Sequence, residues 1–373
     1  MLKQAERGCL VIADITGYTG LMAGSELEHA QDALRDLIQA VVGQLRPQFR
    51  LAKLEGDAAF VYTVADRIDG QHLMDTLEAA YFAFRRRLDA IGRATTCDCN
   101  ACLLLPALNL KIIGHHGAFV RERVFGTEEL GGTDVIVVHR LLKNGVAERL
   151  GMDGYLLLTD ACVAAGDLDP QALGMVQHRE EAEGVGEIAG WVHDLAAAWA
   201  REQAQRRVRI TDRQTAARLD LDLPVAPTTA WHYATAPEQR LRWQAGVIGF
   251  EQGLAAGRRG VGSVNHCVHG EGATLEEILD WRPFDYWTLR STVPHAGAFV
   301  SSQEFAATTD GTHLTIRFQR PASAAERAVM EQMGPMLLDL YRQSLDGLVR
   351  VITADLAAGA VPGAPSAPEA LTA

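Results

Sequence analysis

The sequence predicts two consecutive domains of the α+β class. With 373 residues, the chain is longer than one ordinary hydrophobic core requires. Its 48% hydrophobic and 22% charged residues are typical of a folded, soluble protein. In both halves, short apolar or alternating runs are interleaved with segments of helical periodicity.

The first domain is expected over residues 1–193. Residues 9–13 form a short apolar run typical of a buried strand. After a turn, a capping box at 25–28 starts an amphipathic helix. Residues 50–64 then predict two strands around a tight turn at 55–57, where glycine permits the positive φ that such turns need.

Four later elements complete the first domain. Apolar periodicity predicts a helix over 73–88, a strand over 110–117, a helix over 135–142 and a strand over 155–158. This order suits a sheet with helices on one face. A polar helix rich in alanine and arginine, over 194–212, is expected to link the two domains.

The second domain is expected over residues 213–357. It opens with a half-buried strand, because leucines alternate with aspartates over 219–223. Several strand-like runs follow, of which 314–319 alternates most clearly. A long helix over 324–357 closes the domain, and the Pro/Gly/Ala-rich tail, 358–373, is expected to be disordered.

Composition excludes several functional classes. The net charge of −12 argues against an extended phosphate-binding surface, so nucleic acid is not expected as a main partner. No apolar run approaches the ~18 residues that indicate a membrane span. Residues 1–7 lack the basic-then-apolar layout of a signal peptide, so a cytoplasmic location is expected.

Two short motifs place carboxylates where strands end. Residues 14–19 read Asp-Ile-Thr-Gly-Tyr-Thr, and the N–H groups of the helix that follows can face an anion. Residues 53–57 read Lys-Leu-Glu-Gly-Asp. If the hairpin lies beside the first strand, Asp14 and Asp57 come close together and indicate Mg²⁺ or Mn²⁺. The alternative is a polar hairpin tip with a solvated aspartate.

A third segment completes a family resemblance. Glu129-Leu-Gly-Gly is followed at 134–141 by Asp-Val-Ile-Val-Val-His-Arg-Leu. Together with the two motifs above, this segment resembles the class III adenylate and guanylate cyclase family. The resemblance covers about residues 8–200 and implies a ferredoxin-like, palm-type domain.

The resemblance implies three kinds of site residue. The residues implied to hold the metal are Asp14, Ile15 and Asp57. The residues implied to bind the nucleotide are Gly17, Tyr18, Thr19, Lys53 and Glu129, of which the last two select the base. Arg140 is implied to be catalytic, because it stabilises charge at the α-phosphate.

The implied reaction converts a nucleoside triphosphate, with ATP expected, into a cyclic nucleotide and pyrophosphate. The ribose 3′-oxygen attacks the α-phosphate, and two metal ions make a side-chain base unnecessary. In the family, the metal-binding aspartates come from one protomer. The counterparts of Lys53, Glu129 and Arg140 come from the other, which implies a homodimer.

Two departures from the family pattern leave two hypotheses open. Ile136 stands where the family has an asparagine, and residues 183–190 offer no counterpart of a late lysine. Metal binding is therefore better supported than turnover. The chain is then a nucleotide cyclase of weak activity, or a catalytically degenerate protein that senses a nucleotide or only dimerises.

Three cysteines, Cys97, Cys99 and Cys102, lie close together in the sequence. With His115 or His116 as a fourth ligand they offer a tetrahedral Zn²⁺ site. Their spacing is not the paired arrangement typical of zinc proteins, so reduced thiols on a loop are the alternative. Six cysteines in the whole chain do not make a disulfide scaffold.

The second domain resembles the START-like polyketide cyclase/dehydratase and lipid-transfer superfamily in its element order. That resemblance implies a helix-grip fold, in which the sheet folds around the closing helix and leaves an apolar cavity. The side chains expected to line this cavity are Trp281, Trp287, Phe305, Phe318, Met333 and Tyr341. Ordinary core packing is the alternative for each. A small apolar ligand that regulates the first domain is predicted; a carboxylate or histidine facing the cavity would instead favour a second enzyme.

Overall fold

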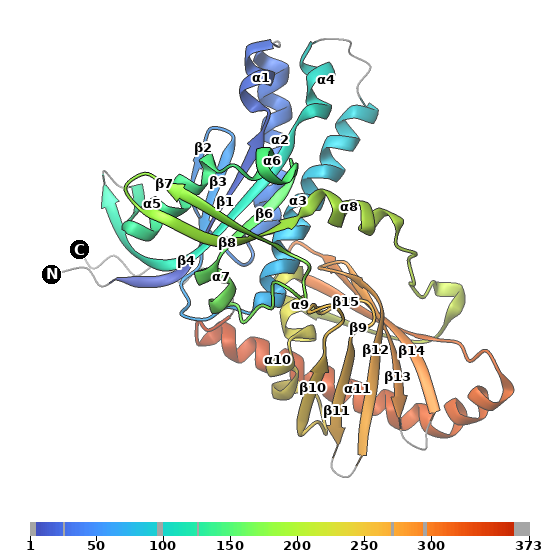
Figure 1. Cartoon of the computed structure of the whole chain (residues 1–373). Helices are drawn as coiled ribbons and strands as arrows, with labels where there is room; N and C mark the ends of the chain where they lie inside the picture. Colours follow the sequence, from blue (N-terminus) through green and yellow to red (C-terminus); the bar gives the residue numbers. More distant parts are fainter. Residues whose placement is uncertain are drawn as a thin grey trace. The chain divides into compact units, whose positions relative to one another are not determined.

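The computed structural model describes residues 5–24, 27–94, 100–124, 127–269, 272–293 and 297–361. The chain divides into two compact units, Met1–Gln205 and Arg206–Ala373, each built on one sheet (Figure 1). The predicted α+β class with two sheets is confirmed. The expected capping residue Ser25 and most of the expected tail, from 362 onward, lie outside the described residues.

The N-terminal unit contains an eight-stranded mixed sheet. Its order is β2-β3-β1-β4-β6-β8-β7, with β5 paired to β4. Neighbouring strands are antiparallel except β4 and β6, which are parallel. The strands are β1 Glu6–Thr16, β2 Arg50–Glu55, β3 Ala58–Tyr62, β4 Asn109–Val124, β5 Thr127–Gly131, β6 Tyr155–Thr159, β7 Val176–Ala182 and β8 Gly186–Asp194.

Helices of the N-terminal unit connect these strands. They are α1 Tyr18–Gly24, α2 Leu27–Leu45, α3 Gly70–Ala94, α4 Asn100–Leu104, α5 Thr133–Arg140, α6 Val146–Leu150, α7 Asp160–Ala165 and α8 Leu195–Ala204. Among the described helices of the whole chain, none is long and apolar enough to span a bilayer.

Helices cover both faces of this sheet, which corrects the expectation of helices on one face. Cys9 and Val11 of β1 pack into a core shared with α2 and α3. Leu10 and Ile12 pack into a second core on the opposite face, where Val138 of α5 joins them. The reason is that successive residues of β1 are apolar, with no alternation of apolar and polar side chains, so both faces of the strand must be buried.

A partly buried hydrogen-bond network holds α5 on the sheet. Asp134, in the first turn of α5, accepts a hydrogen bond from the Ala118 N–H at 2.6 Å. His115 Nε2 lies 3.1 Å from the same carboxylate, and its Nδ1 lies 2.9 Å from Thr159 Oγ1. Gly117 is required beneath α5, because a Cβ there would lie 2.4 Å from a carboxylate oxygen of Asp134. This network decides where the later residues of α5 point.

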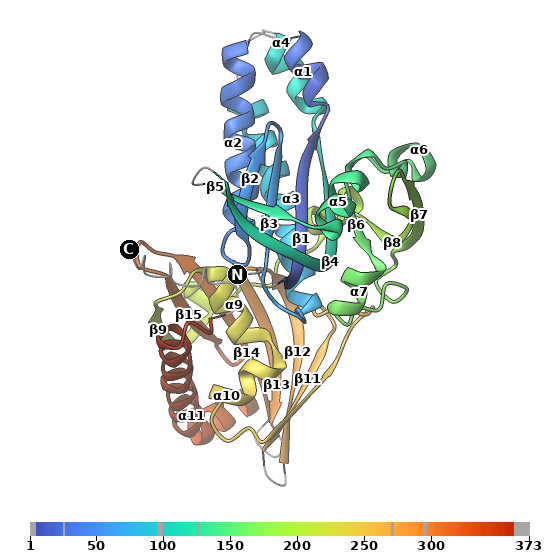
Figure 2. The same ribbon diagram turned by 90° about the vertical axis from the view of Figure 1, so that its left-hand side faces the viewer.

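The C-terminal unit contains an antiparallel sheet that curls along a long helix (Figure 2). Its order is β10-β11-β12-β13-β14-β15-β9. The strands are β9 Thr215–Leu223, β10 Gly249–Gly253, β11 Val264–His269, β12 Gly272–Arg282, β13 Tyr286–Val293, β14 Gly297–Ala307 and β15 Thr312–Gln319. The helices are α9 Pro227–Thr235, α10 Pro237–Trp243 and α11 Ala324–Ala357, the last with the predicted bounds.

The predicted linker helix, 194–212, is shorter in the structure. It corresponds to α8, which ends at Ala204 and buries Leu195 and Ala198 in the core of the N-terminal unit. Its amphipathic start explains this placement, because a helix with an apolar face needs a surface to pack on.

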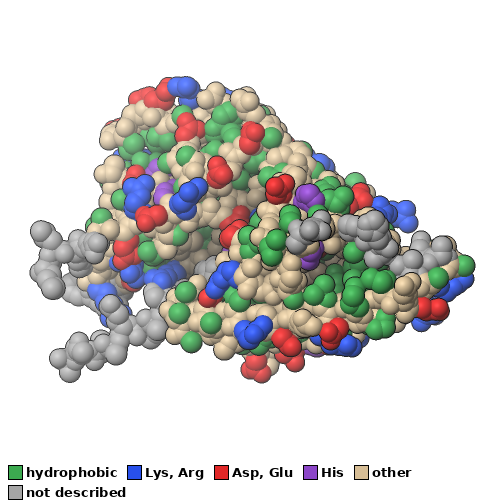
Figure 3. Space-filling view, turned by 90° about the horizontal axis from the view of Figure 1, so that it is seen from below, with side chains coloured by type: hydrophobic (Ala, Val, Ile, Leu, Met, Phe, Trp, Pro, Cys, Tyr) green, Lys and Arg blue, Asp and Glu red, His purple; other side chains and the backbone are tan. Residues whose placement is uncertain are grey.

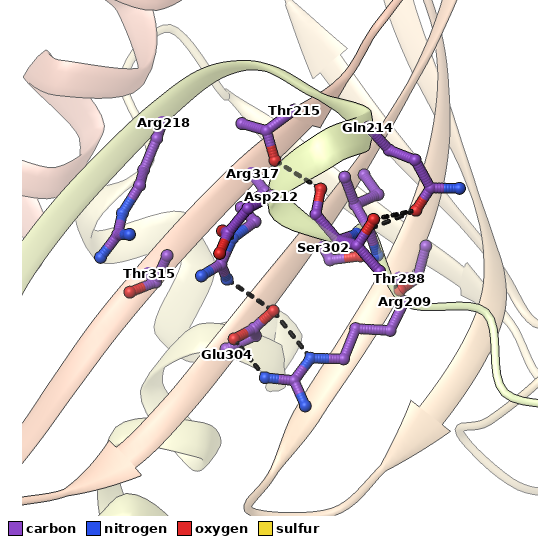
Figure 4. A network of polar contacts seen from close by, with 12 residues as sticks. Arg209, Asp212, Gln214, Thr215, Arg218, Thr288, Ser302, Glu304, Thr315 and Arg317 are labelled. Carbon is purple, nitrogen blue, oxygen red and sulfur yellow. Dashed lines mark hydrogen bonds and ion pairs between the residues drawn. The ribbon is translucent and has the colours of Figure 1, made fainter.

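Residues 206–214 run along the C-terminal sheet and are held there by polar contacts (Figure 4). Arg209 donates two hydrogen bonds to Glu304, at 2.9 and 2.6 Å. Arg317 lies 2.6 Å from Glu304 and 3.1 Å from Asp212. The Ile210 N–H donates to a serine hydroxyl of β14 at 3.0 Å. The segment therefore belongs structurally to the C-terminal unit.

Burial of His115 predicts a pH-dependent stability. Burial lowers the pKa of His115 below its ordinary 6.5, although Asp134 opposes that shift. Above pH 6.5 the histidine is neutral in the folded and unfolded states, so its lowered pKa has no effect on stability. As the pH falls below 6.5, the unfolded state binds a proton first and the folded protein loses stability. We expect the melting temperature to fall between pH 7.5 and 5. His115→Gln should reduce this fall by on the order of 2 °C.

The check is a series of thermal melts with the half-buried His266 changed to Gln as control. An equal pH slope in the parent and in His115→Gln would show that this histidine does not contribute.

Candidate functional site

Charged side chains gather where four neighbouring strands of the N-terminal sheet end. The strand register aligns Glu55 of β2, Ala58 of β3, Asp14 of β1 and Lys111 of β4 in one row. Directly paired residues of antiparallel strands project from the same face of a sheet. Ala58 packs in the core beneath α5, so the three charged residues share the face that α5 covers.

The structure places Asp57 beside Asp14, at the turn that joins β2 and β3. The Asp57 carbonyl accepts a hydrogen bond from the Ile15 N–H at 3.2 Å. Burial and the negative charge of Asp14 raise the pKa of Asp57. Ile15 offers no side-chain ligand, because its apolar side chain is buried in the core. Two neighbouring carboxylates of this kind favour a cation between them.

Lys111 already lies against this pair. Its Nζ is 3.1 Å from Asp14 Oδ2, and both side chains are only 17% exposed. The same Nζ donates a hydrogen bond to the Leu142 carbonyl at 2.9 Å. Lys111 was not predicted as a site residue, although a lysine at the start of an apolar strand is a detectable signal. One lysine compensates one carboxylate, so a negative charge on the pair of Asp14 and Asp57 remains.

A second charged cluster joins β2, β5 and α5. Lys53 Nζ lies 2.9 Å from Glu55 and 3.6 Å from Glu129, so the two residues expected to select a base meet. Glu55 also lies 3.2 Å from His139 of α5. The hydrogen bond that Lys53 donates to Glu55 raises the pKa of Lys53, which stays cationic. Glu55 and His139 were not predicted.

Arg140 and Ile136 lie on the open side of α5. The Arg140 side chain is 47% exposed, and its nearest acidic neighbour, Glu183, is 4.0 Å away. Ile136 is 52% exposed, whereas the three valines of α5 are buried. Together with His139 and Lys143 they line a shallow hollow. Ile136 is therefore not a core residue.

Gly17, Tyr18 and Thr19 mark the transition from β1 into α1. Gly17 has φ 88°, a conformation that favours glycine, and its carbonyl accepts a hydrogen bond from the Leu21 N–H at 3.1 Å. Tyr18 packs against the core, while Thr19 is exposed. Of the three, Thr19 is the side chain that solvent reaches most freely.

The zinc hypothesis stays a prediction. Cys97 and Cys99 lie outside the described residues, as does the side chain of Cys102 in α4. Both candidate histidines already have partners, since His115 contacts Thr159 and Asp134. His116 Nε2 lies 2.9 Å from the Ala65 carbonyl.

The C-terminal unit has a cavity between its sheet and α11. Of the six residues expected to line it, the structure places Tyr341 there. Trp281, Trp287 and Phe305 instead pack around Trp231 of α9, with ring centroids 4.7, 6.4 and 5.3 Å away. This correction follows from strand pairing, which sets Trp281 opposite Trp287 under α9.

The two remaining candidates also lie outside the lining. Phe318 packs edge-on against Tyr341 at 4.9 Å, and Met333 is half-buried on α11. Smaller aliphatic side chains line the cavity in their place, among them Leu314, Ile316 and Leu345. Hydrophobic side chains also gather at the surface on the face shown in Figure 3.

The carboxylate of Glu276 faces the cavity, but it is paired with an arginine. Arg240 donates hydrogen bonds to both oxygens of Glu276, at 2.6 and 2.9 Å. Burial raises the pKa of Glu276, yet Arg240 outweighs burial and the pKa lies below its ordinary value. A paired carboxylate held ionised in this way does not exchange protons readily, so it does not favour a second enzyme.

Family models match two segments of the chain. Residues 34–149 match a family described as a protein of unknown function (DUF2652). Residues 214–353 match the family described as polyketide cyclase/dehydrase and lipid transport. The second match supports the START-like resemblance of the C-terminal unit. The first is not a nucleotide-cyclase family.

One protein sequence and two solved structures are similar to this chain. An uncharacterized protein of Mycobacterium tuberculosis, Rv2561/Rv2562, is 32% identical over 163 residues, which are 44% of this chain and 74% of that protein. The structure of the guanylyl cyclase Cya2 matches at 13% identity and TM-score 0.42, over 52% of this chain and 93% of its own. The structure of protein MLL2253 from Mesorhizobium loti matches at 16% identity and TM-score 0.29, over 36% of this chain and 96% of its own.

Proposed function

We propose that this chain, which belongs to the same family as the uncharacterized Mycobacterium tuberculosis protein, binds and cyclises a nucleoside triphosphate in its N-terminal unit. The observation that carries the proposal is the carboxylate pair, Asp14 and Asp57, beside the Lys53–Glu129 contact. ATP is the expected substrate. The test is incubation of the purified protein with each nucleoside triphosphate and Mn²⁺. A cyclic product supports the proposal, and its absence with all four removes it.

The donor set of the carboxylate pair fits Mg²⁺ or Mn²⁺. Hard divalent cations take oxygen ligands, which Asp14 and Asp57 supply from adjacent strand ends. Lys111 compensates only part of their charge. When bound, the cation would supply Lewis-acid activation of the attacking oxygen and neutralise phosphate charge.

The remaining residues have distinct proposed roles. Lys53 offers hydrogen-bond donors and Glu129 offers acceptors to the edge of a base, and their mutual contact keeps them in place. The contact of Arg140 with Glu183 spans 4.0 Å and is exposed to solvent, so the guanidinium is available to a phosphate group. We propose that these three act across the interface of a homodimer.

A second candidate function is a nucleotide sensor without turnover. Two observations favour it. Ile136 provides no hydrogen bond on the open side of α5, and Lys111 already forms an ion pair with Asp14. In either case, we propose that a small apolar ligand in the C-terminal cavity regulates the N-terminal unit.

Removing either carboxylate tests the cation site. Asp14→Ala or Asp57→Ala is expected to abolish Mn²⁺-dependent nucleotide binding, because one carboxylate cannot hold the ion alone. Isothermal titration with and without Mn²⁺ measures this. Asp89→Ala, at an exposed position of α3, is the matched control. Parent-like, Mn²⁺-dependent binding in both site variants would refute the cation site.

Subunit mixing tests the interface. If each site draws residues from both protomers, a mixed dimer of Asp57→Ala and Arg140→Ala protein contains one complete site. Random exchange makes about half of the dimers mixed, and each mixed dimer has one intact site of two. The mixture is therefore expected to recover up to about a quarter of the parent's cyclase activity. Each variant mixed only with itself is the control. Mixtures that remain inactive after proven exchange of folded subunits would contradict the interface model.

Restoring an amide at Ile136 separates the two candidate functions. For a weakened cyclase, Ile136→Asn is expected to raise turnover ~10-fold, the effect of one hydrogen bond worth ~1.4 kcal/mol. Because Ile136 is exposed, the melting temperature should hardly change. Ile136→Leu is the control and should give no gain. A stable Asn variant with no added cyclic product would favour the sensor.

A further inference from the structure

One wall of the C-terminal cavity is polar. Glu276 of β12 pairs directly with Ser291 of β13, which pairs with Phe299 of β14. The three side chains therefore project from the same face of the sheet, and all of them line the cavity together with Arg240 of α10.

The charges in this wall compensate each other. Arg240 and Glu276 are only 3% and 4% exposed, and they form the two-fold hydrogen-bonded pair described above. Arg240 Nε also donates to Gln244 at 2.9 Å, and Asn265 donates to Glu276 at 3.2 Å. The guanidinium lies over the ring of Phe250, 4.8 Å from its centroid. A charged ligand would meet no unpaired counter-charge here, so its burial would be unfavourable.

Ser291 brings a buried hydroxyl group to this wall. It is 1% exposed, and its Oγ has no hydrogen-bond partner in the described part of the chain. Ser344, across the cavity on α11, differs. Its hydroxyl donates to the Leu340 carbonyl at 2.9 Å and accepts from the Ala245 N–H at 3.1 Å. A buried hydroxyl without a partner is unfavourable, and a ligand that bonds it removes that cost.

The rest of the lining is mainly apolar. Leu314 and Ile316 of β15 face Leu337 and Leu345 of α11 across the cavity. His269, the other titratable side chain on the sheet side, uses Nδ1 to contact the Gly246 carbonyl at 3.1 Å. The surroundings suit an apolar body that carries one polar, uncharged group.

We propose that this cavity takes a neutral molecule with an apolar body and one hydroxyl or carbonyl group, which hydrogen-bonds Ser291 Oγ. It selects against a carboxylate on the same body. The inference rests on the proposed ligand-binding role of the C-terminal unit and names the chemical class of the ligand. It does not depend on nucleotide chemistry in the N-terminal unit.

Matched probes test the selection. The full-length protein is titrated at pH 7.5 with naphthalene, 2-naphthol and 2-naphthoate, and with 1-octanol and octanoate. Displacement of the neutral fluorophore 1-aminoanthracene reports binding. In at least one set, the alcohol is expected to bind at least ~10-fold more tightly than the carboxylate, because the carboxylate would bury a charge without a counter-charge.

Ser291→Ala tests the contact itself. It is expected to weaken binding of the tighter alcohol ~10-fold and to leave naphthalene binding unchanged. Ligand-free Ser291→Ala should melt no lower than the parent, because the hydroxyl has no partner to lose. Thr292→Ala is the matched control, since Thr292 is the next residue of β13 and faces the opposite, exposed side.

The possible outcomes distinguish failure of this inference from failure of the proposed ligand-binding role. A carboxylate that binds as tightly as its alcohol, or unchanged alcohol binding in Ser291→Ala, overturns this inference and leaves the ligand-binding role standing. If no probe of either set binds, the inference and the proposed role of the cavity both fail.

Discussion

Burial of β1 on both faces is the constraint on which the N-terminal unit depends. Its apolar run contributes to two cores, so α2 and α3 must cover one face and α5 the other. Asp14 is the first charged residue after that run, and it lies on the face that α5 covers. The strands on either side of β1 bring Asp57 and Lys111 to the same place. The charged cluster therefore lies where the core beneath α5 stops.

The two units differ in how completely their buried charges are compensated. Beside Asp14 and Asp57, one lysine compensates only one of two carboxylates, so the pair retains negative charge. Burial and the charge of Asp14 raise the pKa of Asp57. In the C-terminal cavity, Arg240 and Glu276 are almost fully buried and bonded to each other through both guanidinium Nη atoms. Incomplete compensation suits an ionic ligand at the first place, and complete compensation suits an uncharged one at the second.

Local motifs allowed much of the candidate site to be predicted. Asp14 and Gly17 follow an apolar run directly, and Lys53 and Asp57 flank a tight turn, so their placement depends on a few neighbouring residues. The closing helix of the C-terminal unit was predictable for the same reason, because its periodicity extends over many turns. Lys111 and His139 could not be assigned in this way, since their partners lie on strands distant in sequence.

Sequence patterns alone predicted the two α+β units, the order of their main elements and the residues that end β1 and form the β2–β3 turn. Only the tertiary structure decided that α5 covers the second face of the sheet, which leaves Ile136 exposed. It also decided that Trp281 and Trp287 belong to a core around Trp231, while Ser291 faces the cavity. The physical reason is common to these cases. Periodicity shows which residues share a face of one element, but strand register and packing between elements determine which other residues that face contacts.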